Sequence, residues 1–175
     1  VWEFSKASEV DPDKCLPARW VLKWSKNEDG TPKAKARLVI QGFKDPDALA
    51  GKLDNNAPTL TALGKHLVLL IAALSGWGLF TADVATAFLS GHPSDRGMSV
   101  SLPSDALRFL GGDQFTRMRL KKSMYGLTDA PKEWYKAALA KMKRLGFIIH
   151  KLDQCLFISV NSKGVMDGVV GIHVD

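Results

Sequence analysis

Cysteines and long hydrophobic runs are scarce in this sequence. Its 175 residues include only two cysteines, Cys15 and Cys155, which lie far apart and form no CxxC pair. This spacing indicates neither a disulfide framework nor a zinc site, and it favours free thiols in a reducing compartment. The best apolar run, residues 67–74, is too short to span a membrane. We therefore expect no membrane partner.

Several motifs of common enzyme classes are also missing. The sequence has no P-loop, no dinucleotide-binding fingerprint and no Ser-His-Asp set. It has no basic-then-apolar leader, and it begins Val1-Trp2-Glu3 without a methionine. Because it also stops within an apolar strand pattern, at Asp175, we expect a fragment that was cut inside its active site.

What the sequence does contain is an excess of positive charge, +6 at pH 7. The excess is concentrated, because residues 117–144 hold nine Lys or Arg and only two acids, Asp129 and Glu133. Such a band suits a polyanion that approaches a metal site. For any single lysine the alternative is a solvated helix face. The length allows one domain with a good core.

Local patterns predict an α+β domain. Residues 19–25 and 33–40 alternate as strands around a turn at 27–30, which predicts a hairpin with a basic face. Helices are expected over residues 61–75 and 132–145, where apolar residues recur at helical spacing and glycines follow. We expect residues 1–18 to be irregular, and further strands at residues 80–84, 97–102, 115–120, 147–150, 155–160 and 165–175. This order predicts helices on one face of an antiparallel sheet.

Two of the expected strands lead into an acid. Asp83 lies near the end of the strand expected at residues 80–84, and Asp175 follows residues 168–174. Two carboxylates at adjacent strand ends can bridge two Mg²⁺ ions about 3.5–4 Å apart, an arrangement that polymerases and nucleases share. An aspartate that ends a strand is also ordinary turn chemistry, so the spacing alone leaves both interpretations open.

Four segments, taken in order, resemble those of copia-type LTR retrotransposon reverse transcriptases. They are residues 33–43 (KAKARLVIQGF), 83–91 (DVATAFLSG), 120–135 (LKKSMYGL, then AP and WY) and 172–175 (IHVD). The resemblance covers nearly the whole chain and implies a right-hand polymerase fold. Residues 1–175 would then be a partial reverse transcriptase domain without the thumb and the ribonuclease H domain. Fingers-like parts would lie at about 1–56 and 85–120, and most of the remainder would be palm.

The resemblance also implies roles for individual residues. The ligands of two Mg²⁺ ions, or of Mn²⁺, would be Asp83, Val84 and Asp175, and the two aspartates would be catalytic. The nucleotide would contact Lys35, Arg37, Phe88, Tyr125 and Gly126. Template and primer would contact Lys121, Lys122 and Pro131. Phe88 would exclude a 2′-hydroxyl, and we favour Arg37 over Lys35 for the triphosphate because charge-assisted contacts from Arg are stronger.

Two departures from the family pattern bear on activity. His173 stands where the family usually has Tyr, and Thr128-Asp129 stands where it usually has Lys-Gln. An acid near a template strand is unfavourable for nucleic-acid binding. Two functions therefore stay open: an RNA-directed DNA polymerase, and a remnant that binds nucleic acid without turnover. A two-metal nuclease is disfavoured, because the basic hairpin and Phe88 have no evident role in it.

The resemblance implies partners as well. For the polymerase these are a primed RNA or DNA template, deoxynucleoside triphosphates and the remainder of a Pol polyprotein. The location it implies is the cytoplasm, in the virus-like particle of a retroelement, or the nucleus, without secretion.

Overall fold

The computed structural model describes residues 1–174. The chain divides into two compact units, the first made of residues 1–55 and 92–130, and the second of residues 56–91 and those from 131 onward. Both units combine strands with helices, so the predicted mixture of α and β structure is confirmed. None of the helices in residues 1–174 has the length and apolar character that a membrane span requires.

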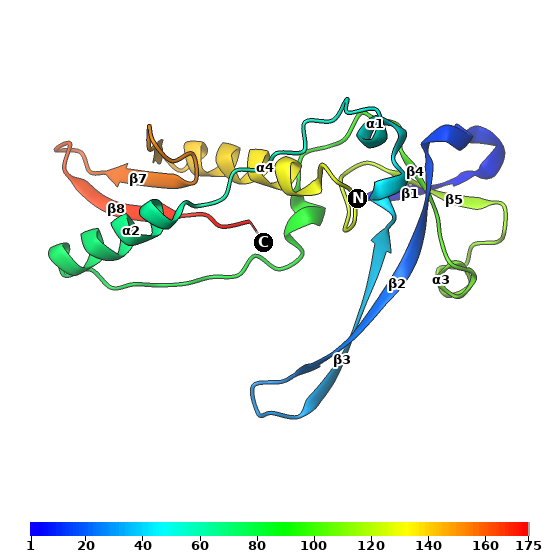
Figure 1. Ribbon diagram of the computed structural model, residues 1–175, viewed down its shortest axis with the longest axis horizontal. Helices are drawn as coiled ribbons and strands as arrows, with labels where there is room; N and C mark the ends of the chain where they lie inside the picture. The colour runs from blue at the N-terminus through cyan, green and yellow to red at the C-terminus, as the bar shows by residue number, and fades with distance from the viewer. Residues whose placement is uncertain (175) are drawn as a thin grey trace. The chain divides into compact units, whose positions relative to one another are not determined.

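A five-stranded sheet in the order β1-β5-β4-β2-β3 forms the base of the first unit (Figure 1). Its strands are β1 (Trp2–Lys6), β2 (Cys15–Lys26), β3 (Pro32–Ile40), β4 (Ser99–Ser101) and β5 (Thr116–Leu120). Neighbours are antiparallel except β2 and β4, which run parallel. The chain between β2 and β4 is long enough to make the return crossing that a parallel pair needs. The predicted antiparallel sheet is therefore confirmed apart from this one parallel pair.

The first strand was not predicted, because residues 1–18 were expected to be irregular. Trp2 pairs with Leu120 and Lys6 with Thr116, so β1 forms the antiparallel edge beside β5. These partners lie more than a hundred residues away in the sequence, so no local sequence pattern indicates the pairing. Two short 3-10 turns, Ala7–Glu9 and Pro12–Lys14, connect β1 to β2.

The predicted hairpin is confirmed and is longer than expected. β2 and β3 pair from Ala18 with Ile40 to Lys26 with Pro32 (Figure 1). Gly30 has φ +83°, the left-handed conformation that a tight turn needs. The side chain of Asp29 fixes the turn, because its Oδ1 accepts hydrogen bonds from the backbone N–H and the hydroxyl of Thr31 at 2.9 and 2.6 Å.

Apolar side chains of β2, β3, β4 and β5 make the core of the first unit. Two short helices border it, α1 (Pro46–Leu49) and α3 (Ser104–Phe109), and a 3-10 turn at Gly42–Lys44 precedes α1. The buried apolar residues there include Leu16, Ile40, Met98, Val100, Met118 and Leu120.

The second unit has a smaller, three-stranded antiparallel sheet in the order β6-β7-β8. Its strands are β6 (Ile148–Ile149), β7 (Leu156–Val160) and β8 (Met166–Gly171). Its helices are α2 (Ala62–Ser75), which packs on β8, and α4 (Ala130–Arg144), whose first residue still belongs to the first unit. The prediction of these two helices is confirmed within two residues at each end.

Helix α2 begins and ends at the residues that its sequence indicated. The Thr61 hydroxyl accepts a hydrogen bond from the Gly64 N–H at 2.9 Å, and Gly76 follows the helix with φ +65°. Asp153 reinforces this start, since its Oδ2 accepts hydrogen bonds from the N–H and the hydroxyl of Thr61 at 3.0 and 2.7 Å. Asp153 therefore joins α2 to the residues just before β7.

The strand predicted at residues 80–84 is absent from the described part of the chain. Residues 77–84 have no regular secondary structure, and Phe80 is 91% exposed. An apolar run becomes a strand only when a neighbour pairs with its backbone groups, and within residues 1–174 no named strand does so here. A second difference concerns α2, whose apolar side chains at Leu63, Leu70 and Leu74 are exposed.

Candidate functional site

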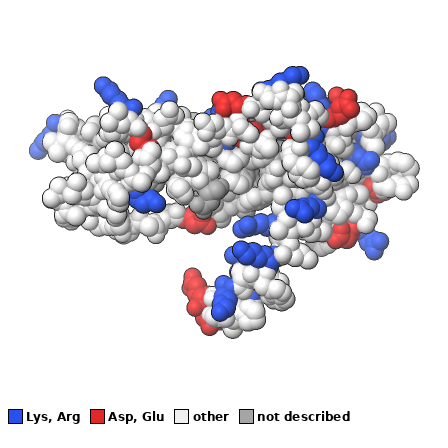
Figure 2. Space-filling model, in the orientation of Figure 1, with Lys and Arg blue, Asp and Glu red and all other residues white. Residues whose placement is uncertain are grey.

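The β2–β3 hairpin separates its basic and apolar side chains onto opposite faces. In the observed register Arg37 lies opposite Val21, and Lys35 lies opposite Lys23. Because side chains alternate across a strand, these residues share one face with Arg19 and Lys33. The other face carries Trp20, Leu22 and Trp24, and the last two are mostly exposed. Figure 2 shows Lys and Arg side chains along the hairpin and acidic side chains at its tip.

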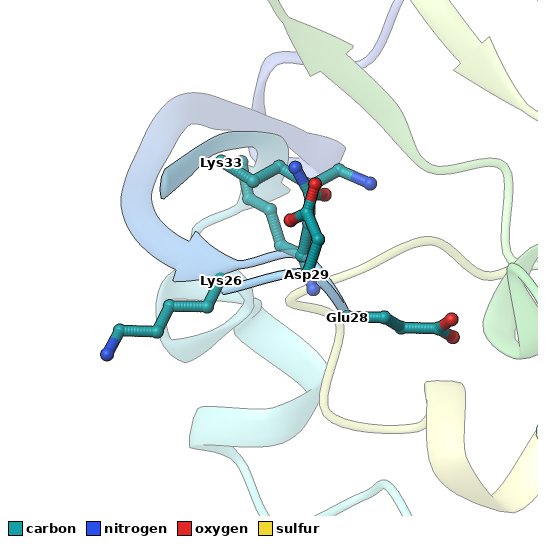
Figure 3. Close-up of a pocket in the computed structure, with 6 residues that line it drawn as sticks. Lys26, Glu28, Asp29 and Lys33 are labelled. Atoms are coloured by element: carbon teal, nitrogen blue, oxygen red, sulfur yellow. The ribbon is translucent and has the colours of Figure 1, made fainter. Parts of the chain in front are cut away.

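Residues at the tip of the hairpin line a hollow that is open to solvent. Figure 3 shows the side chains of Lys26 and Glu28 extending away from the turn in opposite directions. The residues that line the hollow are Lys26, Asn27, Glu28, Asp29, Lys33 and Lys35. Hydrogen bonds from Thr31 lower the pKa of Asp29, so this carboxylate stays charged within the turn. The hollow therefore mixes both signs of charge and presents no focused anion site.

Two predicted nucleotide-contacting residues meet at the base of the hairpin. The Arg37 guanidinium carbon lies 6.0 Å from the centre of the Tyr125 ring. This is the outer limit of a cation–π contact, so the arginine and the aromatic ring present one shared surface. Lys35 lies two residues before Arg37 in β3, on the same face of the strand.

The turn at Tyr125-Gly126 is held against the end of β3 by backbone hydrogen bonds. The Ile40 N–H donates to the Tyr125 carbonyl at 2.8 Å, and the Gly42 N–H donates to the Gly126 carbonyl at 3.1 Å. Gly126 has φ +95°, and a Cβ built on it would overlap the Ile40 carbonyl oxygen and lie 2.6 Å from Val39 Cγ1. Only glycine fits this position, because both the backbone angle and the space exclude a side chain.

Beside this turn lies a group of buried charges that the sequence did not reveal. Arg96 Nη2 lies 2.7 and 2.6 Å from the two carboxylate oxygens of Asp45, and its Nη1 lies 3.0 Å from Asp129 Oδ2. Asp47 completes the group at 3.2 Å from Nη2. Burial of the guanidinium works against its charge, but the carboxylates of Asp45, Asp129 and Asp47 raise the pKa of Arg96.

This group corrects the expectation for Asp129. An acid at that position was expected to place negative charge near a template strand. The structure instead buries the residue to 7% exposure and pairs its carboxylate with Arg96. The sequence carried only one hint, an Asp in place of a family Gln, and the matching base lies 33 residues earlier in the chain.

The predicted metal-binding and steric-gate residues belong to the second unit. Asp83 and Val84 lie in an exposed segment without regular secondary structure before a turn, and Phe88 lies in the 3-10 turn Ala87–Ser90. Thr86, between them, has φ +53°, which is unusual for a β-branched residue and marks local backbone strain. Asp83 is thus an exposed residue that lies three positions before this strained backbone.

The second predicted catalytic acid, Asp175, lies outside the described residues. Among residues 1–174, no three His, Cys, Asp or Glu side chains converge in a way that could hold a metal ion. Within that part of the chain, Asp83 and the carbonyl of Val84 are the predicted oxygen donors. Carboxylate and carbonyl oxygens are the hard ligands that Mg²⁺ prefers, so the donor chemistry fits this ion.

The three residues predicted to contact template and primer have varied surroundings. Lys121 Nζ lies 2.5 Å from Glu3 Oε2, which partly neutralises it. Lys122 forms an isolated antiparallel bridge with Pro93. Pro131 occupies the first turn of α4, as expected from its missing N–H.

Burial raises the pKa of the Cys155 thiol to about 11, which makes that cysteine an unreactive core residue.

Comparison with known proteins gives consistent relatives. Residues 1–175 match the family model described as reverse transcriptase (RNA-dependent DNA polymerase). The Retrovirus-related Pol polyprotein from transposon RE1 of Arabidopsis thaliana is 29% identical over 150 residues, 85% of this chain and 10% of the relative. The corresponding polyprotein from transposon RE2 of the same plant is 28% identical over 150 residues, with the same shares covered.

A third relative comes from another plant. The Retrovirus-related Pol polyprotein from transposon TNT 1-94 of Nicotiana tabacum is 29% identical over 143 residues, 81% of this chain and 10% of the relative. The chain thus spans about a tenth of the length of these relatives, and no solved structure matches it significantly. Since the family model covers all 175 residues, the chain belongs to the reverse transcriptase family of RNA-directed DNA polymerases.

Proposed function

We propose that this chain supplies fingers and palm to a retrotransposon polymerase that copies RNA or DNA into DNA. The reaction would be attack of a primer 3′-hydroxyl on the α-phosphorus of a deoxynucleoside triphosphate, with pyrophosphate as the leaving group. The observation that carries the proposal is the meeting of Arg37 and Tyr125 on the basic face of the hairpin, 6.0 Å apart. A cation and an aromatic surface side by side suit a ligand that joins phosphates to a base.

The residues of the first unit would bind and orient the nucleotide. Arg37 and Lys35 would neutralise the triphosphate, and the rigid guanidinium of Arg37 suits phosphate oxygens better than an ammonium group. Tyr125 would offer its ring to the nucleotide. Gly126, with no side chain, would let the template base approach the backbone. Holding the nucleotide in line with the primer hydroxyl supplies much of the rate in such a reaction.

The residues of the second unit would handle the reacting end of the primer and the sugar. Asp83, the Val84 carbonyl and Asp175 would hold the divalent ions, Mg²⁺ or Mn²⁺. When bound, two such ions lower the pKa of the attacking hydroxyl and stabilise the charge on the leaving group. Phe88 would stack beneath the sugar and exclude a 2′-hydroxyl. The fingers would comprise about residues 1–56 and 85–120, and the palm most of the remainder.

Charge supports binding of a primed template by the same chain. Lys122 and Lys121 follow β5 directly, and Pro131 opens the lysine-rich helix α4. Release of counterions from a nucleic acid drives such binding and makes it salt-dependent. Within the proposal, the neighbouring parts of a Pol polyprotein would be further partners, and a retroelement particle would be the location.

Primer extension tests this function. The protein, expressed with whatever its gene encodes on either side of residues 1–175, is incubated with oligo-dT on poly-rA, dTTP and Mg²⁺. We expect extension that Asp83→Asn abolishes and that Asp167→Asn, which alters an exposed carboxylate on β8, leaves intact. Salt-sensitive binding of the template without extension in any variant would support the alternative of an inactive nucleic-acid-binding remnant.

A further inference from the structure

The group of charges around Arg96 joins three segments of the first unit that are far apart in the sequence. Arg96 lies before β4, Asp45 and Asp47 lie at the start of α1, and Asp129 lies just before α4. Side-chain exposure is 18% for Arg96, 0% for Asp45 and 10% for Asp129. The contacts of Arg96 with Asp45 and Asp129 are mostly buried and charge-assisted, so they hold the segments in fixed positions.

Two of these segments are the ones that form the proposed nucleotide surface. Asp45 follows Gly42 by three residues, and Asp129 follows Gly126 by three residues. Gly42 and Gly126 are themselves joined, because the Gly42 N–H donates to the Gly126 carbonyl at 3.1 Å. Arg96 therefore bridges the two segments just after the point where the Tyr125–Gly126 turn contacts the end of β3.

The position of the Arg96 guanidinium also excludes a cation site within this acidic group. Three carboxylates from two segments resemble a cation site, but Arg96 already occupies its centre, with four oxygens within 3.2 Å of its terminal nitrogens. Asp45 is committed further, since its Oδ1 accepts a hydrogen bond from the Asp47 N–H at 3.0 Å and caps α1. The group is thus an internal ion cluster.

We propose that Arg96 is a positioning residue for the polymerase reaction. By neutralising Asp129 and Asp45 together, it locks the Tyr125–Gly126 turn onto β3 and keeps the Tyr125 ring beneath Arg37. The acid at position 129, which departs from the family pattern, is tolerated because this chain supplies Arg96 as its counter-charge. The inference rests on the proposed function for its catalytic consequence, and on the hydrogen-bond geometry alone for its structural one.

The structural consequence is tested without activity. Hydrogen-exchange mass spectrometry follows the amides of residues 38–44, which include the Ile40 and Gly42 donors, in the parent and in Arg96→Gln. We expect exchange of these amides to speed up about tenfold or more in the variant, while the α2 amides of the other unit keep their rates. Unchanged exchange at residues 38–44 would overturn the proposal whether or not the protein is a polymerase.

The catalytic consequence is tested by steady-state kinetics in a parent whose extension depends on Asp83. We expect Arg96→Gln to raise KM for dTTP about tenfold and to change kcat by less than about threefold, because the nucleotide surface shifts while the metal-binding segment does not. Arg96→Lys, which keeps the charge but not the fork, should recover part of this loss. The double variant Arg96→Gln/Asp129→Asn should bind dTTP better than Arg96→Gln alone, because one buried carboxylate is no longer unpaired.

The outcomes separate the two claims. A parent without Asp83-dependent extension refutes the proposed function, and the exchange measurement then decides the structural claim alone. An active parent in which Arg96→Gln leaves KM for dTTP unchanged refutes the positioning role. If Arg96→Gln and Arg96→Lys both raise KM and lower kcat to the same extent, and both lower the melting temperature, the positioning role is also refuted. Such a result indicates only a general loss of folding.

Discussion

Asp153 offers the sharpest test of how the second unit is held together. Its carboxylate accepts three hydrogen bonds, two from Thr61 at 3.0 and 2.7 Å and one from the Cys155 N–H at 2.9 Å. The Thr61 hydroxyl in turn accepts from the Gly64 N–H, so the acid supports the cap of α2 through its neighbour. Gly64 itself has no room for a side chain, because a Cβ there would overlap Asp153 Oδ2.

Replacement of Asp153 by alanine leaves the backbone N–H groups of Thr61 and Cys155 without this acceptor. A buried donor that loses its partner costs about 1–3 kcal/mol. The Cys155 N–H is buried and the Thr61 N–H makes a partly buried bond, so the two together give an expected loss of about 3 kcal/mol in the free energy of opening α2. Asp153→Asn keeps one carbonyl oxygen and should lose about half as much.

Hydrogen exchange of the α2 amides measures this free energy directly. A loss of about 3 kcal/mol corresponds to about a hundredfold fall in protection. Asp167→Ala is the matched control, because that carboxylate accepts one hydrogen bond from Ser159 at 2.6 Å but is exposed. Its effect should stay within about 0.5 kcal/mol. Protection of α2 that changes less than threefold in Asp153→Ala would refute the reasoning.

The contribution of Asp153 should also depend on pH. Burial works against the ionised carboxyl, but the hydrogen bonds from Thr61 and Cys155 lower the pKa of Asp153 in the folded chain. A lowered folded pKa means that the stabilisation is complete above the unfolded pKa, about 3.9, and is lost as the pH falls through the folded value. The difference between the parent and Asp153→Asn should therefore be constant above pH 5 and shrink below pH 4.

Two further predictions concern the proposed nucleotide site. Gly126→Ala should lower the free energy of unfolding by about 3 kcal/mol in chemical denaturation, because φ is +95° and the Cβ would overlap Ile40; Gly30→Ala, with φ +83° and open space, should cost only about 1 kcal/mol, and equal effects would contradict the packing argument. Phe88→Ala should raise incorporation of ribonucleotides relative to deoxynucleotides by at least about tenfold in single-nucleotide extension. An unchanged ratio would remove Phe88 from the sugar pocket.

Sequence patterns predicted the elements whose causes are local. The β2–β3 hairpin follows from strict alternation around a turn with Gly30, and both signals lie within about twenty residues. Helix α2 follows in the same way from its cap Thr61 and from Gly76, which is free to adopt the left-handed conformation. The basic face of the hairpin was predictable because alternation alone assigns each side chain to a face.

The predictions that were wrong concern features whose causes are distant in the sequence. β1 exists because β5 pairs with it. Residues 80–84 form no strand because no described strand pairs with them. Arg96 was missed for the same reason, since its partners Asp45 and Asp129 lie 51 and 33 residues away. Neither a charge nor a short apolar run reveals its partner when that partner comes from another part of the chain.

Primer extension by the parent and by Asp83→Asn tests the central claim most directly. On oligo-dT and poly-rA with dTTP and Mg²⁺, the account predicts extension by the parent and by Asp167→Asn. It predicts no detectable product from Asp83→Asn, although that variant should bind the primed template as the parent does. Extension that persists at the parental rate in Asp83→Asn would contradict the claim that this aspartate holds the catalytic ions.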